Sequence, residues 1–172
     1  MTDTFCSVIL LGMSTTDNSV KVIEIVGLIG ETSEFFLLPL HNVKELHLDM
    51  TKTTFMNSVG VKHWIMWTLK VPKSSKIILK KCPHMIASQA SMVTGFLPSH
   101  FAIQSFFAPF LCPSCETEHN VELISGVHYQ PAAAGVSSWI KLPEMKCPKC
   151  KGAENLEPDF FPEKVFSFLN HK

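Results

Sequence analysis

Apolar and polar residues repeat along the chain with two different periods. Alternation with period two, which is typical of half-buried strands, runs through residues 19–26 and 44–50. Apolar positions spaced three or four residues apart, as on one face of an amphipathic helix, run through residues 59–70 and 84–97. Shorter patterns predict strands at 7–11, 76–79 and 101–107, and a short apolar segment, helical before Pro39, at 32–40.

The order of these elements predicts the fold class of residues 1–108. Strands that alternate with helices form βαβ units, and such units place parallel strands in one sheet. Asn57 or Ser58 suits the N-cap of the helix at 59–70, and Pro72 lies just past its end. We therefore expect an α/β domain with a mixed sheet and helices packed on it.

Residues 109–172 have a different pattern and indicate a second, smaller unit. Strand-like pieces at 119–124 and 138–142 flank a stretch rich in Pro, Ala and Gly, and a short helix is expected after Pro162. A unit of about 60 residues buries little apolar surface and often needs a staple. We expect a β-rich appendage with a C-terminal helix whose aromatic face packs back on the protein.

The strongest chemical signal is a pair of Cys-x-x-Cys motifs, Cys112-Pro-Ser-Cys115 and Cys147-Pro-Lys-Cys150. Each motif offers two thiolates from one tight turn, and four sulfurs complete a closed tetrahedral metal site. The spacer of 31 residues is longer than that of the usual zinc motif. We expect a zinc ribbon with structural Zn²⁺; iron in a rubredoxin-like site, disulfides or unused thiols are the alternatives. His119 and His128 are expected to be ordinary histidines, because four cysteines already complete the ligand set.

Residues 44–97 resemble a STAS domain, the fold of bacterial anti-sigma factor antagonists. Three segments carry the likeness. Residues 46–50 are similar to a central strand of the family that ends in an Asp-containing turn, and residues 55–61 (Phe-Met-Asn-Ser-Val-Gly-Val) are similar to the family's Phe-x-Asp-Ser-Ser-Gly-Leu. Residues 77–79 and 92–97 are similar to the next strand and to the end of the following helix. The resemblance implies a phosphoprotein in bacterial signalling. An anti-sigma factor that is itself a kinase would phosphorylate Ser58, and the unphosphorylated protein would bind that factor.

Two residues depart from the family pattern beside this serine. Asn57 replaces the family's Asp, and Val59 replaces its second Ser. The alternative reading is that Asn57 and Ser58 only cap the helix, and that the chain is a zinc-stabilised scaffold or adaptor without phosphoregulation. Asn57, Val59 and Trp67 are the residues that we expect on the partner-binding surface, while Gly60 is explained by close packing.

Composition narrows the classes of function. The chain has 15 basic and 15 acidic residues and no Arg, so nucleic acid is not an expected partner. We find no paired carboxylates, open metal site, Gly-rich phosphate loop or nucleophile–base pair, and we expect neither an enzyme nor a small-molecule ligand. Cys82 and Cys6 are predicted to be buried thiols rather than nucleophiles.

The location of the protein is also an expectation from the sequence. The apolar run at 35–40 contains Pro39 and is too short to cross a bilayer, and no secretory signal is visible. We expect a cytoplasmic protein without membrane contact. In a reducing compartment, paired cysteines are interpreted first as metal ligands.

Overall fold

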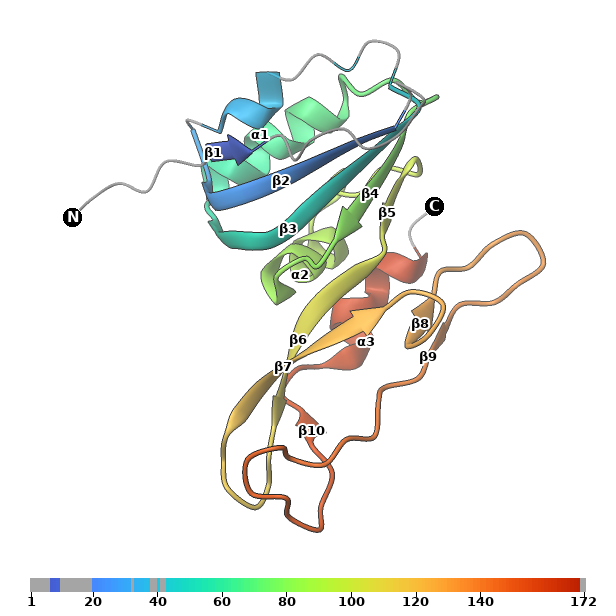
Figure 1. The fold of residues 1–172 in the computed structure, drawn as a ribbon. Helices are drawn as coiled ribbons and strands as arrows, with labels where there is room; N and C mark the ends of the chain where they lie inside the picture. Colours follow the sequence, from blue (N-terminus) through green and yellow to red (C-terminus); the bar gives the residue numbers. More distant parts are fainter. Residues whose placement is uncertain (1–6, 10–19, 32, 38–39, 41–42, 171–172) are drawn as a thin grey trace.

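The computed structural model describes residues 7–9, 20–31, 33–37, 40 and 43–170. It is a mixed α/β fold with one five-stranded sheet and two small antiparallel sheets (Figure 1). The first part of the chain contains β1 Ser7–Ile9, β2 Val20–Ile29, the 3-10 helix η1 Glu34–Leu37, β3 Glu45–Met56, α1 Ser58–Thr68, β4 Lys76–Lys80, α2 His84–Met92 and β5 Phe101–Ile103. The second part contains β6 Ser105–Leu111, β7 Glu118–Ile124, β8 Tyr129–Gln130, β9 Trp139–Ile140, β10 Glu157–Pro158, α3 Pro162–Val165 and the 3-10 helix η2 Phe166–Asn170.

The first sheet has the order β1-β2-β3-β4-β5. β2 to β5 are parallel, and β1 pairs with β2 in the antiparallel sense. Because β3, β4 and β5 are neighbours, right-handed crossovers place α1 and α2 on the same face of the sheet. On that face Trp64 of α1 stacks on Phe96 and meets the ring of Phe101 of β5. The expected α/β class with parallel strands is confirmed.

Several element boundaries differ from the predicted ones. β3 continues to Met56, well past the predicted strand at 44–50, and its pairing with β2 survives two register shifts. α2 ends at Met92 rather than 97, because Val93 is extended (φ −110°, ψ 114°). Only the 3-10 helix η1 forms in the segment 32–40.

The predicted strand at 101–107 is two strands in two sheets. β5 closes the first sheet, and β6 lies between β10 and β7 in the second. Figure 1 shows β6 leading from one sheet to the other. The change of sheet falls at Gln104, a few residues before the compositional boundary at 108.

The C-terminal segment packs against both parts of the chain, as expected. The Phe168 N–H donates to Ser91 Oγ of α2 at 3.2 Å, and Ser167 Oγ donates to the Ser91 carbonyl at the same distance. Phe166 contacts Phe106 of β6 and Tyr129 of β8. The bonds to Ser91 thus join the end of the chain to α2, and the aromatic contacts join it to β6 and β8.

The fold also tests two smaller expectations. Cys82 is fully buried, with Sγ 3.5 Å from Met50 Sδ, and burial raises the pKa of its thiol. The expectation of an inert buried thiol is therefore confirmed for Cys82, whereas Cys6 lies outside the described residues. Within the described part of the chain, no helix is long and apolar enough to span a membrane.

Candidate metal centre and the start of helix α1

The first Cys-x-x-Cys turn follows directly on β6. The Glu116 N–H donates to the Cys112 carbonyl at 2.9 Å, and the Cys112 N–H donates to the Thr117 carbonyl at 3.0 Å. These two bonds close the chain around Cys112 and Cys115 and lead it into β7. Glu116 has φ +52°, a left-handed conformation that costs a residue with a side chain about 1–2 kcal/mol.

The second turn repeats this geometry. The Lys151 N–H donates to the Cys147 carbonyl at 3.0 Å, and Lys151 has φ +54°. The Gly152 N–H points at Cys150 Sγ, 3.4 Å away. A Cβ on Gly152 would stand 2.7 Å from Ser114 Oγ of the first turn, so the two turns are in close contact here.

The two turns bring four sulfurs together. The Sγ atoms of Cys112, Cys115, Cys147 and Cys150 all lie within 4.8 Å of one another, with 3.6 Å between Cys112 and Cys150 and 3.8 Å between Cys115 and Cys147. Four sulfurs at about 2.3 Å from a tetrahedral Zn²⁺ would lie about 3.8 Å apart. The predicted ligand set is therefore assembled closely enough to hold a metal ion, with spacings compatible with tetrahedral zinc.

The site has a buried side and an open side. Cys112 and Cys147 are buried, Cys115 is partly buried and Cys150 is exposed. The Thr117 hydroxyl, 3.4 Å from Cys115 Sγ, is the main cause that lowers the pKa of Cys115 to about 6. The Gly152 N–H lowers the pKa of Cys150, but the Cys112 thiol and desolvation outweigh it and raise that pKa to about 12. Metal binding by such a cluster releases protons, because the ligands are thiolates.

His119 is the residue at this site that the sequence reasoning missed. Its Nε2 lies 3.3 Å from Cys147 Sγ. His119 sits on β7 opposite Phe110 of β6, the strand that enters the first turn, and this pairing brings the ring to the cluster. The register between β6 and β7 is the information that would have predicted this contact of His119. His128, in contrast, accepts the Ile124 N–H at Nδ1 in a local turn, as an ordinary histidine does.

The second candidate site is the start of α1. Asn57 is the N-cap, and its Oδ1 accepts the Gly60 N–H at 2.7 Å, which confirms the predicted cap. Ser58 is the first helical residue and is exposed. Val59 is partly buried. The expectation for Trp67 is wrong: its side chain is only 3% exposed, because it packs against Trp64 and Phe101 in the core.

Gly60 confirms its predicted packing role. A Cβ at this position would stand 2.2 Å from the Ile29 carbonyl oxygen at the end of β2. The Asn57 N–H donates to the same oxygen at 3.2 Å. The first turn of α1 is thus held directly against the end of β2, which fixes where Ser58 emerges.

Comparison with known proteins leaves these two sites without an assigned role. No protein-family model matches the chain, and no curated protein matches it.

Proposed function

We propose that the chain is a non-enzymatic regulatory protein that binds a protein partner through the surface around Ser58, and that phosphorylation of Ser58 switches this binding. One observation carries the proposal. Ser58 is exposed at the first position of α1, while the neighbouring Asn57 already supplies the helix cap. The Ser58 side chain is therefore accessible to a modifying enzyme, and its modification would leave the helix cap in place.

The electrostatics of a helix start support this switch. The first backbone N–H groups of a helix lack intrahelical partners, and the helix dipole is positive at this end. A phosphate of about two negative charges is tolerated at such a position in the free protein. The same charge buried in a protein interface is repelled or desolvated, so phosphorylation would release the partner. The resemblance of residues 55–61 to the STAS motif points to an anti-sigma factor, or a kinase of that kind, as the partner.

In this proposal the cysteine cluster has a structural role. Four thiolates close the coordination shell of a zinc ion and leave no position for substrate or water. The second candidate function is a zinc-stabilised scaffold or adaptor in which Ser58 is never modified. Asn57 favours this candidate, because it replaces the carboxylate that the family carries beside the serine.

A capture experiment distinguishes the two candidates. Tagged wild type, Ser58→Ala, Ser58→Asp and Ser74→Asp are each incubated with lysate of the native cell, and bound proteins are identified by mass spectrometry. Ser74 is the matched control: it is an exposed serine in the turn after α1, and Ser74→Asp makes the same charge change away from the helix start.

We expect one partner that binds wild type, Ser58→Ala and Ser74→Asp but is lost with Ser58→Asp. Mass spectrometry of the protein from the same cells should also find phosphate on Ser58. A partner that binds wild type and all three variants equally would support the adaptor and rule out the switch.

A further inference from the structure

The five-stranded sheet has one face without a helix among the described residues. α1 packs its Trp64 on one face, η1 contacts α1, and α3 and η2 pack on α2. Crossover handedness puts α1 and α2 on the same side, so every described helix is accounted for there. Parallel sheets are normally covered on both faces. The other face of β2 to β5 is therefore the place to look for a missing partner.

Strand register arranges this open face in three rows. The middle row is Val22, His47, Ile78 and Ala102, which are paired across β2 to β5. One flanking row is Val20, Glu45 and Lys76, and the other is Glu24, Asp49 and Lys80. A mainly apolar row, in which Val22 is 42% exposed and Ile78 only 9%, is thus bordered by charges, as the core of a protein interface is bordered by its polar rim.

The charges on this face are separated by strand. β3 carries the acidic Glu45 and Asp49, and β4 carries Lys76 and Lys80 directly opposite them. Lys76 Nζ lies 3.8 Å from Glu45 Oε2 and is 62% exposed, so its charge still faces solvent. His47 hydrogen-bonds the other oxygen of Glu45. That bond is the main cause that lowers the pKa of Glu45, and the two lysines add to it, so Glu45 is ionised near neutral pH.

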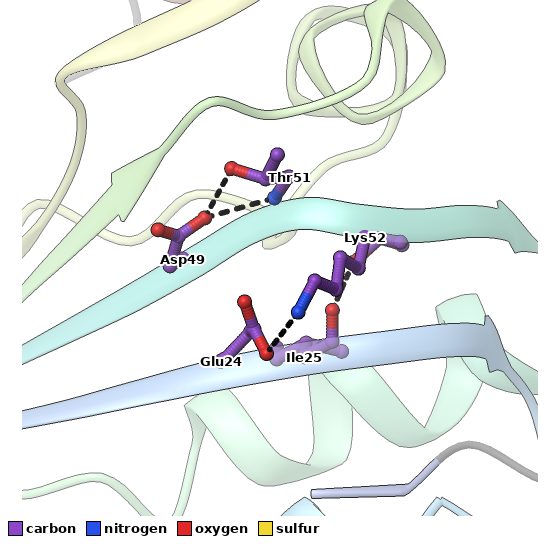
Figure 2. Close-up of polar contacts among 6 residues, drawn as sticks. Glu24, Ile25, Asp49, Thr51 and Lys52 are labelled. Atoms are coloured by element: carbon purple, nitrogen blue, oxygen red, sulfur yellow. Dashed lines mark hydrogen bonds and ion pairs between the residues drawn. The ribbon is translucent and has the colours of Figure 1, made fainter. Parts of the chain in front are cut away.

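The edge of the face toward β2 is cross-linked by polar contacts. Figure 2 shows Lys52 Nζ of β3 reaching Glu24 Oε2 of β2 at 3.0 Å, and Asp49 Oδ1 accepting the Thr51 N–H at 2.9 Å, with α1 behind the strands. Thr53 Oγ1 also donates to the Ile25 carbonyl at 3.3 Å. These contacts hold the side chains of the face in place before any partner arrives, which lowers the entropic cost of binding.

We propose that this face is an interface for a second copy of the chain, related by a two-fold axis that runs parallel to the strands between β3 and β4. Such an axis places β3 of one copy over β4 of the other. Glu45 then faces Lys76 of the second copy, Asp49 faces its Lys80, and His47 covers its Ile78. In each flanking row the β3 acids and β4 lysines of the two copies then form an alternating square of two negative and two positive charges, while Glu24 stays paired with Lys52 of its own chain. An axis perpendicular to the strands would instead bring β3 onto β3 and acid onto acid.

The area of the face determines how tightly the two copies are expected to bind. The middle row has four residues and each flanking row has three, far fewer than the roughly 20–30 residues a side of a standard interface of about 800 Å² per partner, so the dimer should be weak and depend on concentration. The charged rim is exposed and is therefore screened by salt. The inference goes beyond the proposed function and does not depend on it, because Ser58 lies at the start of α1 on the opposite side of the sheet.

Charge reversal in two complementary variants tests the interface. The apparent dimer constants of wild type, Lys76→Glu, Glu45→Lys and an equimolar mixture of the two variants are measured by sedimentation over concentrations up to about 1 mM. We expect each variant alone to associate at least about tenfold more weakly than wild type, because its row carries only one sign of charge. The mixture should associate at least as well as wild type, because unlike charges then face each other across the axis.

Lys62→Glu is the matched control, since Lys62 is exposed on α1 and the change in net charge equals that of Lys76→Glu. It should dimerise like wild type. Thermal unfolding followed by circular dichroism checks that all variants fold. A wild-type mass that stays monomeric throughout the concentration range, a mixture that associates no better than its components, or equal weakening by Lys62→Glu would each overturn the proposal.

Discussion

The Cα of Gly60 lies so close to Ile29 that a Cβ built on it would stand 2.2 Å from the Ile29 carbonyl oxygen. This contact joins the first turn of α1 to the end of β2. Helix propensity favours Ala over Gly by about 1 kcal/mol, so the glycine is present for space and not for helix formation. The position of Ser58 therefore depends on a residue that has no side chain.

Gly60→Ala should destabilise the protein, although propensity alone predicts a gain. The new methyl group would meet backbone atoms, which cannot move aside as a side chain can, and overpacking of this kind costs about 1–3 kcal/mol. Urea unfolding should give a lower free energy for Gly60→Ala than for wild type. Gly135→Ala is the control: Gly135 has φ +77°, but a Cβ there would have no described atom within 4 Å, so only backbone strain of about 1–2 kcal/mol applies. A Gly60→Ala variant as stable as wild type would contradict the close contact.

The cap and the serine beside it should respond differently to truncation. Asn57→Ala removes the bond from the Gly60 N–H and should cost about 1 kcal/mol, whereas Ser58→Ala should stay within about 0.5 kcal/mol of wild type. Asn57→Asp should match or exceed wild type, because a carboxylate also caps and interacts well with the helix dipole. Chemical unfolding measures all three. A large loss with Ser58→Ala would give the serine a structural role instead.

The purified, reduced protein should contain one zinc ion per chain. Cys115→Ser should lower the metal content to near zero and unfold the second unit, because structural zinc contributes on the order of 10–16 kcal/mol in small finger peptides. Elemental analysis gives the stoichiometry, and a loss of near-ultraviolet circular dichroism reports the loss of aromatic packing, including that of the buried Tyr129. Cys82→Ala, which changes a cysteine outside the cluster, should keep its zinc. A folded, reduced wild type without metal would refute the zinc site, and bound iron would reassign the ion.

His119 should slow the release of the metal. A hydrogen bond from Nε2 to the Cys147 thiolate would stabilise that ligand, and loss of such a contact typically lowers metal affinity about 10–100-fold. His119→Phe should therefore transfer zinc to a chromogenic chelator at least about tenfold faster than wild type, and His119→Gln, which keeps a donor, should lie between the two. His128→Gln should behave like wild type. Equal release rates for all four proteins would leave His119 as a surface histidine.

Stability should fall in mildly acidic solution because of His84. Burial lowers the pKa of His84 in the folded protein, and its Nε2 has no hydrogen-bond partner among the described residues. The unfolded chain therefore binds a proton on His84 more readily than the folded protein does. The contribution of neutral His84 to the unfolding free energy is present above pH 6.5 and is lost as the pH falls through the pKa of His84 in the folded protein. His84→Gln should show a flatter fall in unfolding free energy from pH 7.5 to 5.5, measured against wild type at each pH. An unchanged slope would exclude His84 as the cause. Burial lowers the pKa of His100 as well, so His100→Gln is the parallel test.

Local patterns predicted a large part of this architecture correctly. The helix at 59–70, its cap at Asn57 and the strand at 76–79 depend on neighbours in the sequence, and the structure has them nearly in place. Boundaries set by distant contacts were predicted poorly. β3 runs to Met56 because β2 pairs with it along its length, and the pattern at 101–107 gave no sign that Gln104 divides two sheets.

For the candidate sites, the sequence by itself determined which residues carry the chemistry, because Cys-x-x-Cys turns and helix caps are encoded within a few positions. Only the tertiary structure decided which of these residues contact one another and which are buried. It placed His119 beside Cys147, buried Trp67 in the core and aligned the acidic β3 with the basic β4. These relations depend on strand register and crossover handedness, which join residues that are far apart in the chain. The pattern of residues along one sequence does not directly indicate strand register or crossover handedness.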